Sequence, residues 1–252
     1  MKVAAFQAPL AACYANEALD LIREQVTRCE ALGVEFLCCP EGAIGGLADY
    51  AERPASIAID VGRGQLDEAL APLASETVTT IVGFTETDGA GRLYNSAAVF
   101  HRTSVVGIYR KLHPAINRSV YTAGHDMPVF TVGGLTFGVV ICRDSMFSEP
   151  ATNMVARGAT ALFVPTNNGM PSAKGGPGLV AKARACDVAR AVESGVSVIR
   201  ADVAGQTLDL VADGCSGIVS RDGVVLASAQ RFAAELVVAD IGASSLTNTE
   251  GA

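Results

Sequence analysis

Three residues of the sequence have side chains that together could carry out covalent catalysis. Glu41 follows the apolar run FLCCP, Lys111 follows GIYR, and Cys142 ends the run GVVIC. A carboxylate can accept the proton of a thiol, and the resulting thiolate is a strong nucleophile. An ammonium can stabilise both the thiolate and an oxyanion that develops on a substrate carbonyl. The three residue types therefore predict nucleophilic attack by cysteine on a carbonyl group.

Each of the three residues also has an ordinary structural interpretation. A cysteine at the end of a buried strand is more often a small core residue, a glutamate after proline can cap a turn, and a lysine at a strand end is usually solvated. A Cys–His pair that uses His113 or His125 stays open as well, and the third histidine, His101, is equally isolated in the sequence. Whether the three side chains lie close together in the fold therefore decides between a catalytic and a structural role.

The segments that carry these residues alternate between strand-like and helix-like patterns. A helical spacing of apolar residues covers 16–32, and the expected strands of this half are 2–7, 34–39, 79–85, the hairpin arms 93–100 and 105–110, and 135–142. Reacting groups in open α/β sheets gather beyond the ends of strands. Glu41, Lys111 and Cys142 all follow strand-like segments, so they can meet in one pocket beyond the strand ends.

The second half of the chain repeats this plan. Strands are expected at 160–164 and 196–200, a helix at 178–194, and a hairpin at 217–220 and 224–227. The passage GATALFVPTNNG in this half resembles GVEFLCCPEG in the first, and in both a proline ends the strand because it cannot donate to the ladder. Asn167 and Asn168 are therefore predicted to face the same pocket as Glu41.

Composition predicts one folded α/β domain over 1–242 and a polar C-terminal tail over 243–252. Of the 252 residues 50% are hydrophobic and 18% are charged, and the formal net charge is -7 without any basic stripe. These values exclude the usual nucleic-acid and membrane-surface binders and favour a small-molecule partner. The apolar start of the chain breaks at Gln7 and Pro9, so we interpret it as a strand and not as a signal peptide.

Cysteine usage indicates a reducing, cytoplasmic compartment. The seven cysteines form no Cys-x-x-Cys pair and no even set, which argues against a disulfide framework and against a zinc site. An oxidation-sensing role for Cys142 has no resolving cysteine near it in the sequence.

The sequence resembles the nitrilase superfamily, the carbon-nitrogen hydrolases. Its pattern of Pro-Glu after a strand, Tyr-Arg-Lys-x-His, and Ile-Cys-x-Asp-x-x-Phe-x-Glu is present at 40–41, 109–113 and 141–149. The agreement extends over GATALFVPT, ARAVES, GCSGIVSRDGVVLASA and ELVVADI, at 158–166, 189–194, 214–229 and 235–241. It covers nearly the whole chain in the right order.

This resemblance implies a four-layer α-β-β-α sandwich with two mixed sheets and internal pseudo-symmetry. It also implies that Glu41 is the general base and later acid, that Lys111 stabilises the tetrahedral intermediate, and that Cys142 is the nucleophile. The backbone N–H of Arg143 would be the second oxyanion donor, while its side chain would be free to pair with Asp144 or to reach substrate. No metal or organic cofactor is implied, and a homodimer or higher homo-oligomer is expected.

The sequence departs from the family pattern mainly in the loop after Lys111. Many members carry a second glutamate there, in Glu-x-x-x-aromatic-x-x-Gly, whereas this chain has Asn117 at that position and Tyr121 at the aromatic one. Asn117 is thus a candidate substrate or lysine contact, unless the loop runs differently. Ser148 in place of the usual proline and Asp202 in place of asparagine are interpreted as structural changes.

Position in the sequence also suggests which residues bind the substrate. Tyr50 and Tyr121 lie in the loops after Glu41 and Lys111, and their phenols, with the amides of Asn167 and Asn168, suit a polar substrate. Asparagine after a strand is also common turn chemistry. The loop PSAKGGPG at 171–178 is a candidate lid or helix entry, and its Lys174 could meet a substrate carboxylate.

The leading hypothesis is a thiol amidohydrolase that acts on a small linear amide or N-carbamoyl compound and releases ammonia or an amine. Nothing in the sequence points to nitriles. The alternative is a weakly active or inactive member that binds a small molecule or regulates a partner, which the missing second glutamate suggests and the complete triad opposes.

Overall fold

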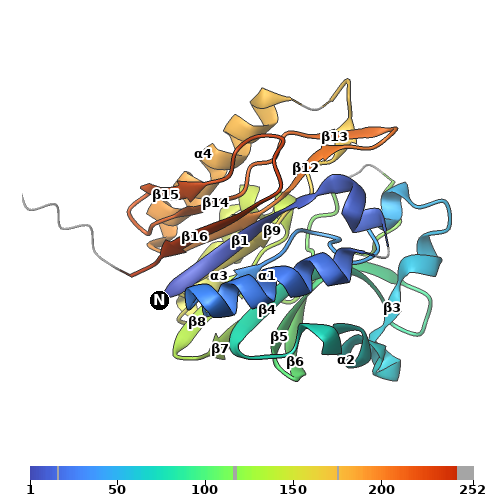
Figure 1. Ribbon diagram of the computed structural model, residues 1–252, viewed down its shortest axis with the longest axis horizontal. Coiled ribbons are helices and arrows are strands. Elements are labelled where there is room, and N and C mark those ends of the chain that lie inside the picture. The colour runs from blue at the N-terminus through green and yellow to red at the C-terminus, as the bar shows by residue number, and fades with distance from the viewer. Residues whose placement is uncertain (16, 116–117, 175, 243–252) are drawn as a thin grey trace, which may run out of the picture.

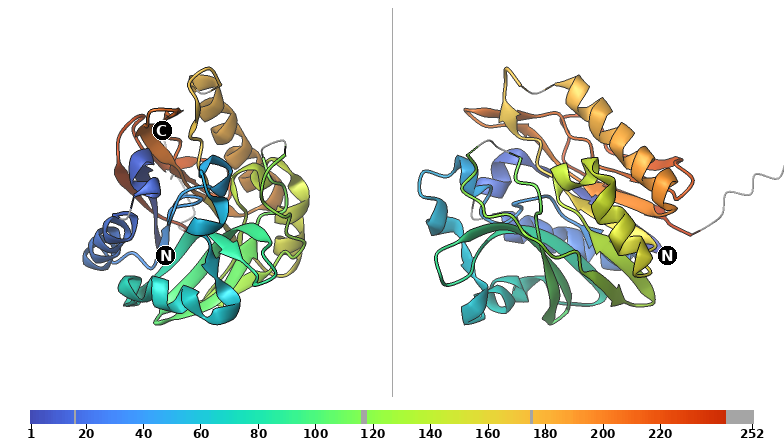
Figure 2. Two further views of the ribbon diagram at one scale, coloured as in Figure 1. Left: turned by 90° about the vertical axis from the view of Figure 1, so that its right-hand side faces the viewer. Right: turned by 180° about the vertical axis from the view of Figure 1, so that it is seen from behind.

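The computed structural model describes residues 1–15, 17–115, 118–174 and 176–242. Two β-sheets pack face to face, and helices cover the outer face of each sheet (Figures 1 and 2). The chain thus forms the four-layer α-β-β-α sandwich that the family resemblance implied. Residues 243–252, the predicted tail, lie outside the described part of the chain.

The first sheet follows the order β10-β13-β12-β1-β2-β4-β5-β6, with β16 paired to β1 and β3 paired to β4. At its centre β1, β2 and β4 are parallel, and β5 and β6 extend it antiparallel. Its strands are β1 Lys2–Pro9, β2 Phe36–Cys38, β3 Ile59–Asp60, β4 Ser75–Thr87, β5 Leu93–Arg102, β6 Ser104–Arg110, β10 Met170–Pro171, β12 Val203–Gln206, β13 Leu210–Ala212 and β16 Glu235–Asp240.

The second sheet repeats this plan in the order β15-β14-β11-β9-β8-β7. Strands β11, β9 and β8 are parallel, and the outer pairs are antiparallel. Its strands are β7 Val129–Val132, β8 Leu135–Val139, β9 Ala161–Pro165, β11 Ser197–Ala201, β14 Gly217–Val219 and β15 Val225–Ser228. Strands β2 and β9 take the central position of their sheets, which is the repeat predicted from the two similar passages.

Four helices form the outer layers. They are α1 Ala18–Leu32 and α2 Gln65–Leu70 on the first sheet, and α3 Ser148–Ala156 and α4 Pro177–Ser194 on the second. Alternate residues of β1 serve the two interfaces, since Ala4 packs in the core with α1 and α2 whereas Val3 packs between the sheets. Between the sheets, Phe36 of β2 stacks edge-on against Phe137 of β8, with ring centroids 5.5 Å apart. This dry interface fixes the separation of β2 from the second sheet.

Two sequence expectations need correction. The strand expected over 135–142 ends at Val139, and Cys142 begins a short 3₁₀ helix over Cys142–Met146. Helix α3 was not expected at all, because its nine residues are too few to show a clear helical spacing and include a proline. The helix expected over 178–194 is confirmed and begins at Pro177, a residue suited to a first helical turn. Of the loop at 171–178, Pro171 belongs to β10 and the last two residues belong to α4, while residue 175 lies outside the described part of the chain.

Each of the seven cysteines lies in the described part of the chain and is unpaired. Burial raises the pKa of Cys13, Cys29 and Cys38 to about 12 each. Within the described ranges no helix is long and apolar enough to cross a membrane.

The buried thiols predict a loss of stability at alkaline pH. Above about pH 8.5 a cysteine ionises in the unfolded chain but keeps its proton in the fold, so unfolding releases protons. The free energy of unfolding then falls by about 1.4 kcal/mol per pH unit for each such thiol, up to its raised folded pKa. Urea unfolding under reducing conditions at pH 7 to 10.5 measures this slope. The double variant Cys29→Ala/Cys38→Ala should reduce this slope by the contribution of two thiols. An unchanged slope would show that other groups cause the loss of stability.

Candidate active site

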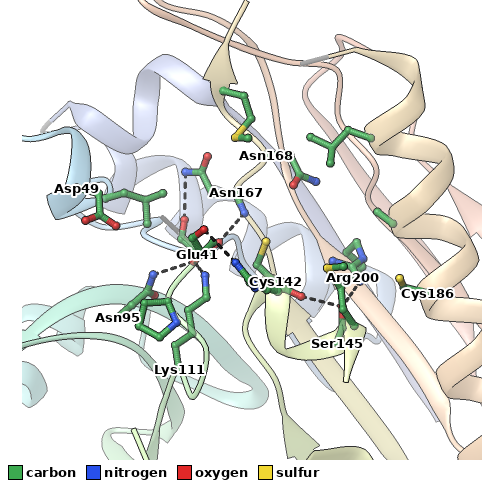
Figure 3. Close-up of a pocket in the computed structure, with 18 of the residues that line it drawn as sticks. Glu41, Asp49, Asn95, Lys111, Cys142, Ser145, Asn167, Asn168, Cys186 and Arg200 are labelled. Carbon is green, nitrogen blue, oxygen red and sulfur yellow. Dashed lines mark hydrogen bonds and ion pairs between the residues drawn. The ribbon is translucent and has the colours of Figure 1, made fainter. Parts of the chain in front are cut away.

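A single cavity of about 380 Å³ brings the three predicted catalytic residues together (Figure 3). Its lining also includes five residues that the sequence suggested for substrate contact, namely Tyr50, Tyr121, Arg143, Asn167 and Asn168. Lys174 is not part of the lining, and Asn117 lies outside the described residues. The strand ends therefore converge as expected, from both sheets.

Glu41 is held by donors from both sheets. Its Oε1 accepts from Lys111 Nζ at 2.5 Å and from Asn95 Nδ2 at 2.7 Å, and its Oε2 accepts from the Asn167 N–H at 3.0 Å. The Glu41 turn lies directly over β4, where a Cβ on Gly83 would stand 2.7 Å from Glu41 Cα. Glycine at that position is what allows this close approach. Burial and three donors hold the carboxylate in one orientation.

Lys111 follows β6 and is as deeply buried as Glu41. Its N–H donates to Asn95 O at 2.8 Å, and its carbonyl accepts from the Gly124 N–H at 2.8 Å. Burial by itself lowers the pKa of Lys111, but the charge of Glu41, the Cys142 sulfur and the hydrogen bond to Glu41 outweigh it and raise the pKa above the ordinary value. Lys111 is thus a fixed cation beside the carboxylate.

Cys142 presents its thiol from a strained turn. Its φ is +46°, in the left-handed region that side-chain-bearing residues rarely adopt. Burial and the Glu41 charge raise the pKa of Cys142 to about 12, although Lys111 and Arg200 act to lower it. The thiol is therefore protonated at neutral pH, and a base must remove its proton when it attacks.

The turn after Cys142 offers backbone N–H groups to an anion. The first bond of the 3₁₀ helix runs from the Asp144 N–H to Ile141 O at 3.0 Å, so the N–H of Arg143 precedes the first bonded turn. The Arg143 side chain does not pair with Asp144 as the sequence allowed. Its Nη1 donates to Ala115 O at 3.1 Å, because the Asp144 carboxylate is buried and turned inward.

Asp144 links the lysine loop to the cysteine turn. Its carboxylate accepts from the Tyr109 hydroxyl at 2.7 Å, from the His113 N–H at 2.8 Å and from the Ile141 N–H at 3.3 Å. The His113 ring lies 2.9 Å from the same carboxylate and stacks on Phe147. His113 is thus engaged away from the thiol. The other two histidines lie elsewhere, with His125 exposed beside Asp126 and His101 beside Thr79. None of the three lines the cavity, so the geometry does not support a Cys–His pair.

A sequence profile of the carbon-nitrogen hydrolase family matches residues 2–250. The chain belongs to this family. The glutamine-dependent NAD+ synthetase of Xanthomonas campestris is 31% identical over 227 residues, which make up 85% of this chain and 39% of the synthetase. A nitrilase of Pyrococcus abyssi is 32% identical over 187 residues, 73% of this chain and 68% of the nitrilase. The chain therefore spans about two fifths of the length of the synthetase it matches.

Solved structures share the fold. A mutant of the Nesterenkonia AN1 amidase from the nitrilase superfamily aligns with a TM-score of 0.77 at 22% identity, covering 95% of this chain and 91% of the amidase. The glutamine-dependent NAD+ synthetase of Acinetobacter baumannii in complex with ADP aligns with a TM-score of 0.79 at 21% identity, covering 94% of this chain and 44% of the synthetase.

The residues that the sequence suggested for substrate contact differ in how their polar atoms are used. The Tyr121 hydroxyl accepts from the Ala48 N–H at 2.6 Å and bonds with Thr85 Oγ1 at 2.8 Å, so it ties two loops together while its ring lines the cavity. Asn168 is held by Asp202, whose Oδ2 accepts from Asn168 Nδ2 at 2.9 Å. Asp202 therefore acts on the wall of the cavity, in line with the structural interpretation. The Tyr50 ring, half-buried, also lines the wall.

Several polar residues of the cavity lining were missed in the sequence, among them Ser145 and Lys182. Three further ones support the site: Asn95 of β5 holds Glu41, Asp49 binds the 119–120 loop, and Arg200 of β11 is linked to the Cys142 turn through Ser145. For Asn95 and Arg200 a signal was present, because each is a polar residue inside an apolar strand and buried polar groups need partners. For Asp49 no local signal existed, since a loop aspartate is commonplace.

Proposed function

We propose that this hydrolase is a thiol amidohydrolase that cleaves the carbon-nitrogen bond of a small linear amide or N-carbamoyl compound through a thioester on Cys142. The observation that carries the proposal is the ion pair of Glu41 and Lys111, 2.5 Å apart and buried, in the cavity that also holds the Cys142 thiol. A base, a cation and a nucleophile within one enclosed space are what acyl transfer requires.

The first step forms the carbon-sulfur bond. Glu41 takes the thiol proton as the sulfur of Cys142 attacks the substrate carbonyl carbon, and the carbonyl oxygen becomes an oxyanion. The Lys111 ammonium and the Arg143 N–H are the groups placed to stabilise that oxyanion. Because the thiol is neutral before attack, this proton transfer is an obligatory part of the step.

The following steps return the enzyme to its starting state. The carbon-nitrogen bond breaks, the proton on Glu41 passes to the leaving nitrogen, and ammonia or an amine departs from a thioester. Water then loses a proton to Glu41 as it attacks the thioester, the carbon-sulfur bond breaks, and that proton returns to the sulfur. A carbamoyl substrate would follow the same course through a thiocarbamate.

The walls of the cavity favour a small substrate. Apolar side chains contribute much of the lining, among them Leu47, Met146, Met170 and Leu179. The names of the relatives widen the choice, because glutamine, which the related synthetases depend on, is itself a linear primary amide, and other relatives are named nitrilases. Glutamine and nitriles therefore belong in the substrate test beside short amides and ureido acids.

The test is ammonia release from a matched panel of short aliphatic amides, glutamine, ureido acids and the corresponding nitriles. We expect turnover of at least one amide or ureido acid and slower release from its nitrile partner. Fluoroacetamide is a suitable covalent probe, because its acetamide moiety is attached to the active-site cysteine in a mutant of the Nesterenkonia amidase. A folded protein that gives neither turnover nor a mass adduct on Cys142 would instead favour a small-molecule-binding or regulatory role.

A further inference from the structure

The guanidinium of Arg200 is a buried charge that the steps above do not use. Arg200 lies on β11, is 2% exposed, and lines the same cavity as Cys142 (Figure 3). Its counter-ion is Asp187 of α4, whose two carboxylate oxygens each accept from Arg200 Nε at 2.9 Å. A buried ion pair costs desolvation free energy and is often no more stable than an apolar replacement. The presence of the Arg200–Asp187 pair beside the cavity that holds Cys142 therefore calls for an explanation.

The guanidinium reaches the cysteine turn through one serine. Arg200 Nη2 donates to Ser145 Oγ at 2.8 Å, and the Ser145 hydroxyl donates to Cys142 O at 2.7 Å. The carbonyl of Cys142 belongs to the residue with φ +46°. A strained residue keeps its conformation only when its surroundings fix it, and this chain of hydrogen bonds is such a restraint.

The same guanidinium reaches the glutamate loop on its other side. Arg200 Nη1 donates to Thr166 Oγ1 at 2.7 Å, and Thr166 O accepts from the Glu41 N–H at 3.2 Å. One planar group with five donors is thus bonded toward both the nucleophile and the base. The Cys142 turn and the Glu41 loop belong to different sheets. No short stretch of chain therefore fixes the distance between them.

We propose that Arg200 is a positioning residue that fixes the Cys142 turn relative to the Glu41 loop, and that its charge, partly balanced by Asp187, favours the Cys142 thiolate. This inference rests on the proposed function for its catalytic meaning, but the reactivity of the thiol can be measured without any substrate. The charges of Glu41, Lys111, Arg200 and Asp202 act on the Cys142 sulfur, and of these Lys111 and Arg200 favour the thiolate. Asp49 and Lys182 line the same cavity, and Asp187 acts through its ion pair with Arg200.

The charge part of the proposal predicts opposite effects from two substitutions in one ion pair. Arg200→Met removes a cation near the sulfur, so the thiolate fraction at a given pH falls. Asp187→Asn leaves that cation uncompensated, so the thiolate fraction rises. We expect the rate of Cys142 alkylation by iodoacetamide at pH 8 to fall roughly tenfold in the first variant and to rise in the second, since one pKa unit is a tenfold change in thiolate.

The measurement follows the Cys142 peptide by mass spectrometry, because the half-buried Cys186 also lines the cavity. The matched control is Arg190→Met, which removes a different buried arginine. Arg190 lies on α4, pairs with Glu193 and is not part of the cavity lining. It should leave the alkylation rate unchanged. A change of the same sign in Arg200→Met and Asp187→Asn would mean that both residues only support the fold, and it would overturn the charge assignment.

The positioning part is tested by Ser145→Ala, which breaks the link to Cys142 O and leaves the ion pair in place. We expect kcat to fall about tenfold with little change in KM on the best substrate of the panel, and alkylation to stay within about twofold of wild type, because the variant loosens the Cys142 turn and leaves the Arg200 charge in place. An unchanged kcat would overturn this part. If Arg200→Met does not fold, the neutral pair Arg200→Met/Asp187→Leu replaces it, with a smaller expected fall in alkylation, because the loss of the Asp187 charge offsets part of the loss of the Arg200 charge. If no substrate turns over, the proposed function fails while the alkylation contrast still decides the charge.

Discussion

Cys142→Ala is expected to abolish turnover of every substrate and to prevent any covalent adduct at the site. The Cys142 sulfur is the only protein atom that forms a covalent bond to the substrate in the proposed cycle, so its removal leaves binding and the oxyanion donors without a nucleophile. Loss of a nucleophile of this kind lowers kcat by at least about 10⁴-fold. Steady-state ammonia release and intact-mass spectrometry after incubation with substrate measure the two effects.

The control for this variant is Cys29→Ala, which makes the same substitution at a buried position of α1. It should cost some stability and leave kcat near wild type. Activity of Cys142→Ala above the level of a mock purification would disprove covalent catalysis at this residue, whatever the other variants show. Cys142→Ser gives a further check, because a hydroxyl is a weaker nucleophile than a thiol and should leave only a trace of activity.

Lys111→Met is expected to destabilise the fold as well as remove activity, whereas the double variant Glu41→Gln/Lys111→Met should recover stability alone. The single substitution leaves the Glu41 carboxylate buried with only the neutral donors Asn95 and Asn167. Breaking one side of a buried ion pair costs about 3–5 kcal/mol, and removing both charges avoids that penalty. Both variants should lose kcat by about 10³-fold or more, because the oxyanion loses its cation and, in the double variant, the base is lost too.

Urea unfolding at pH 7 and ammonia release measure the two properties on the same preparations. The raised pKa of Lys111 sets the pH range in which the ion pair stabilises the fold. Its contribution is complete below the unfolded pKa of about 10.4 and disappears as the pH rises through the higher folded value, so pH 7 reports it fully. Recovery of activity in the double variant would show that the charges of Glu41 and Lys111 serve only to stabilise the fold. Equal stability of the single and double variants would show that Glu41 finds another partner.

Most helices and strands could be predicted from the sequence, because their residue patterns are strong. Strands β1, β4 and β9 are apolar runs bounded by turn residues, and α1 has helical spacing that ends at Gly33 with a left-handed φ of 67°. The errors occur where tertiary contacts decide the local structure. Helix α3 is only nine residues long and packs against β8 and α4.

The site was predictable in its residue types but not in its supports. Glu41, Lys111 and Cys142 stand out because their chemistry is complementary and each follows a strand. Asn95 and Arg200 were missed because their roles depend on partners 54 and 58 positions away, Glu41 and Cys142. Hydrogen bonds between such distant residues leave no periodic trace in the sequence.

The sequence by itself indicated the family and predicted the class of reaction, because a nucleophile, a base and a cation are suggested by residue type and by the motifs around them. It also indicated that Glu41 and Asn167 belong to equivalent strand ends. Only the tertiary structure decided that these two ends touch, with the Glu41 carboxylate bound to the Asn167 N–H across two sheets. It also decided that the charged pair after the thiol divides, with Asp144 turned into the core and Arg143 left at the mouth. The physical reason is that burial and hydrogen-bond partners are set by the packing of the two sheets, which brings together residues from distant parts of the chain.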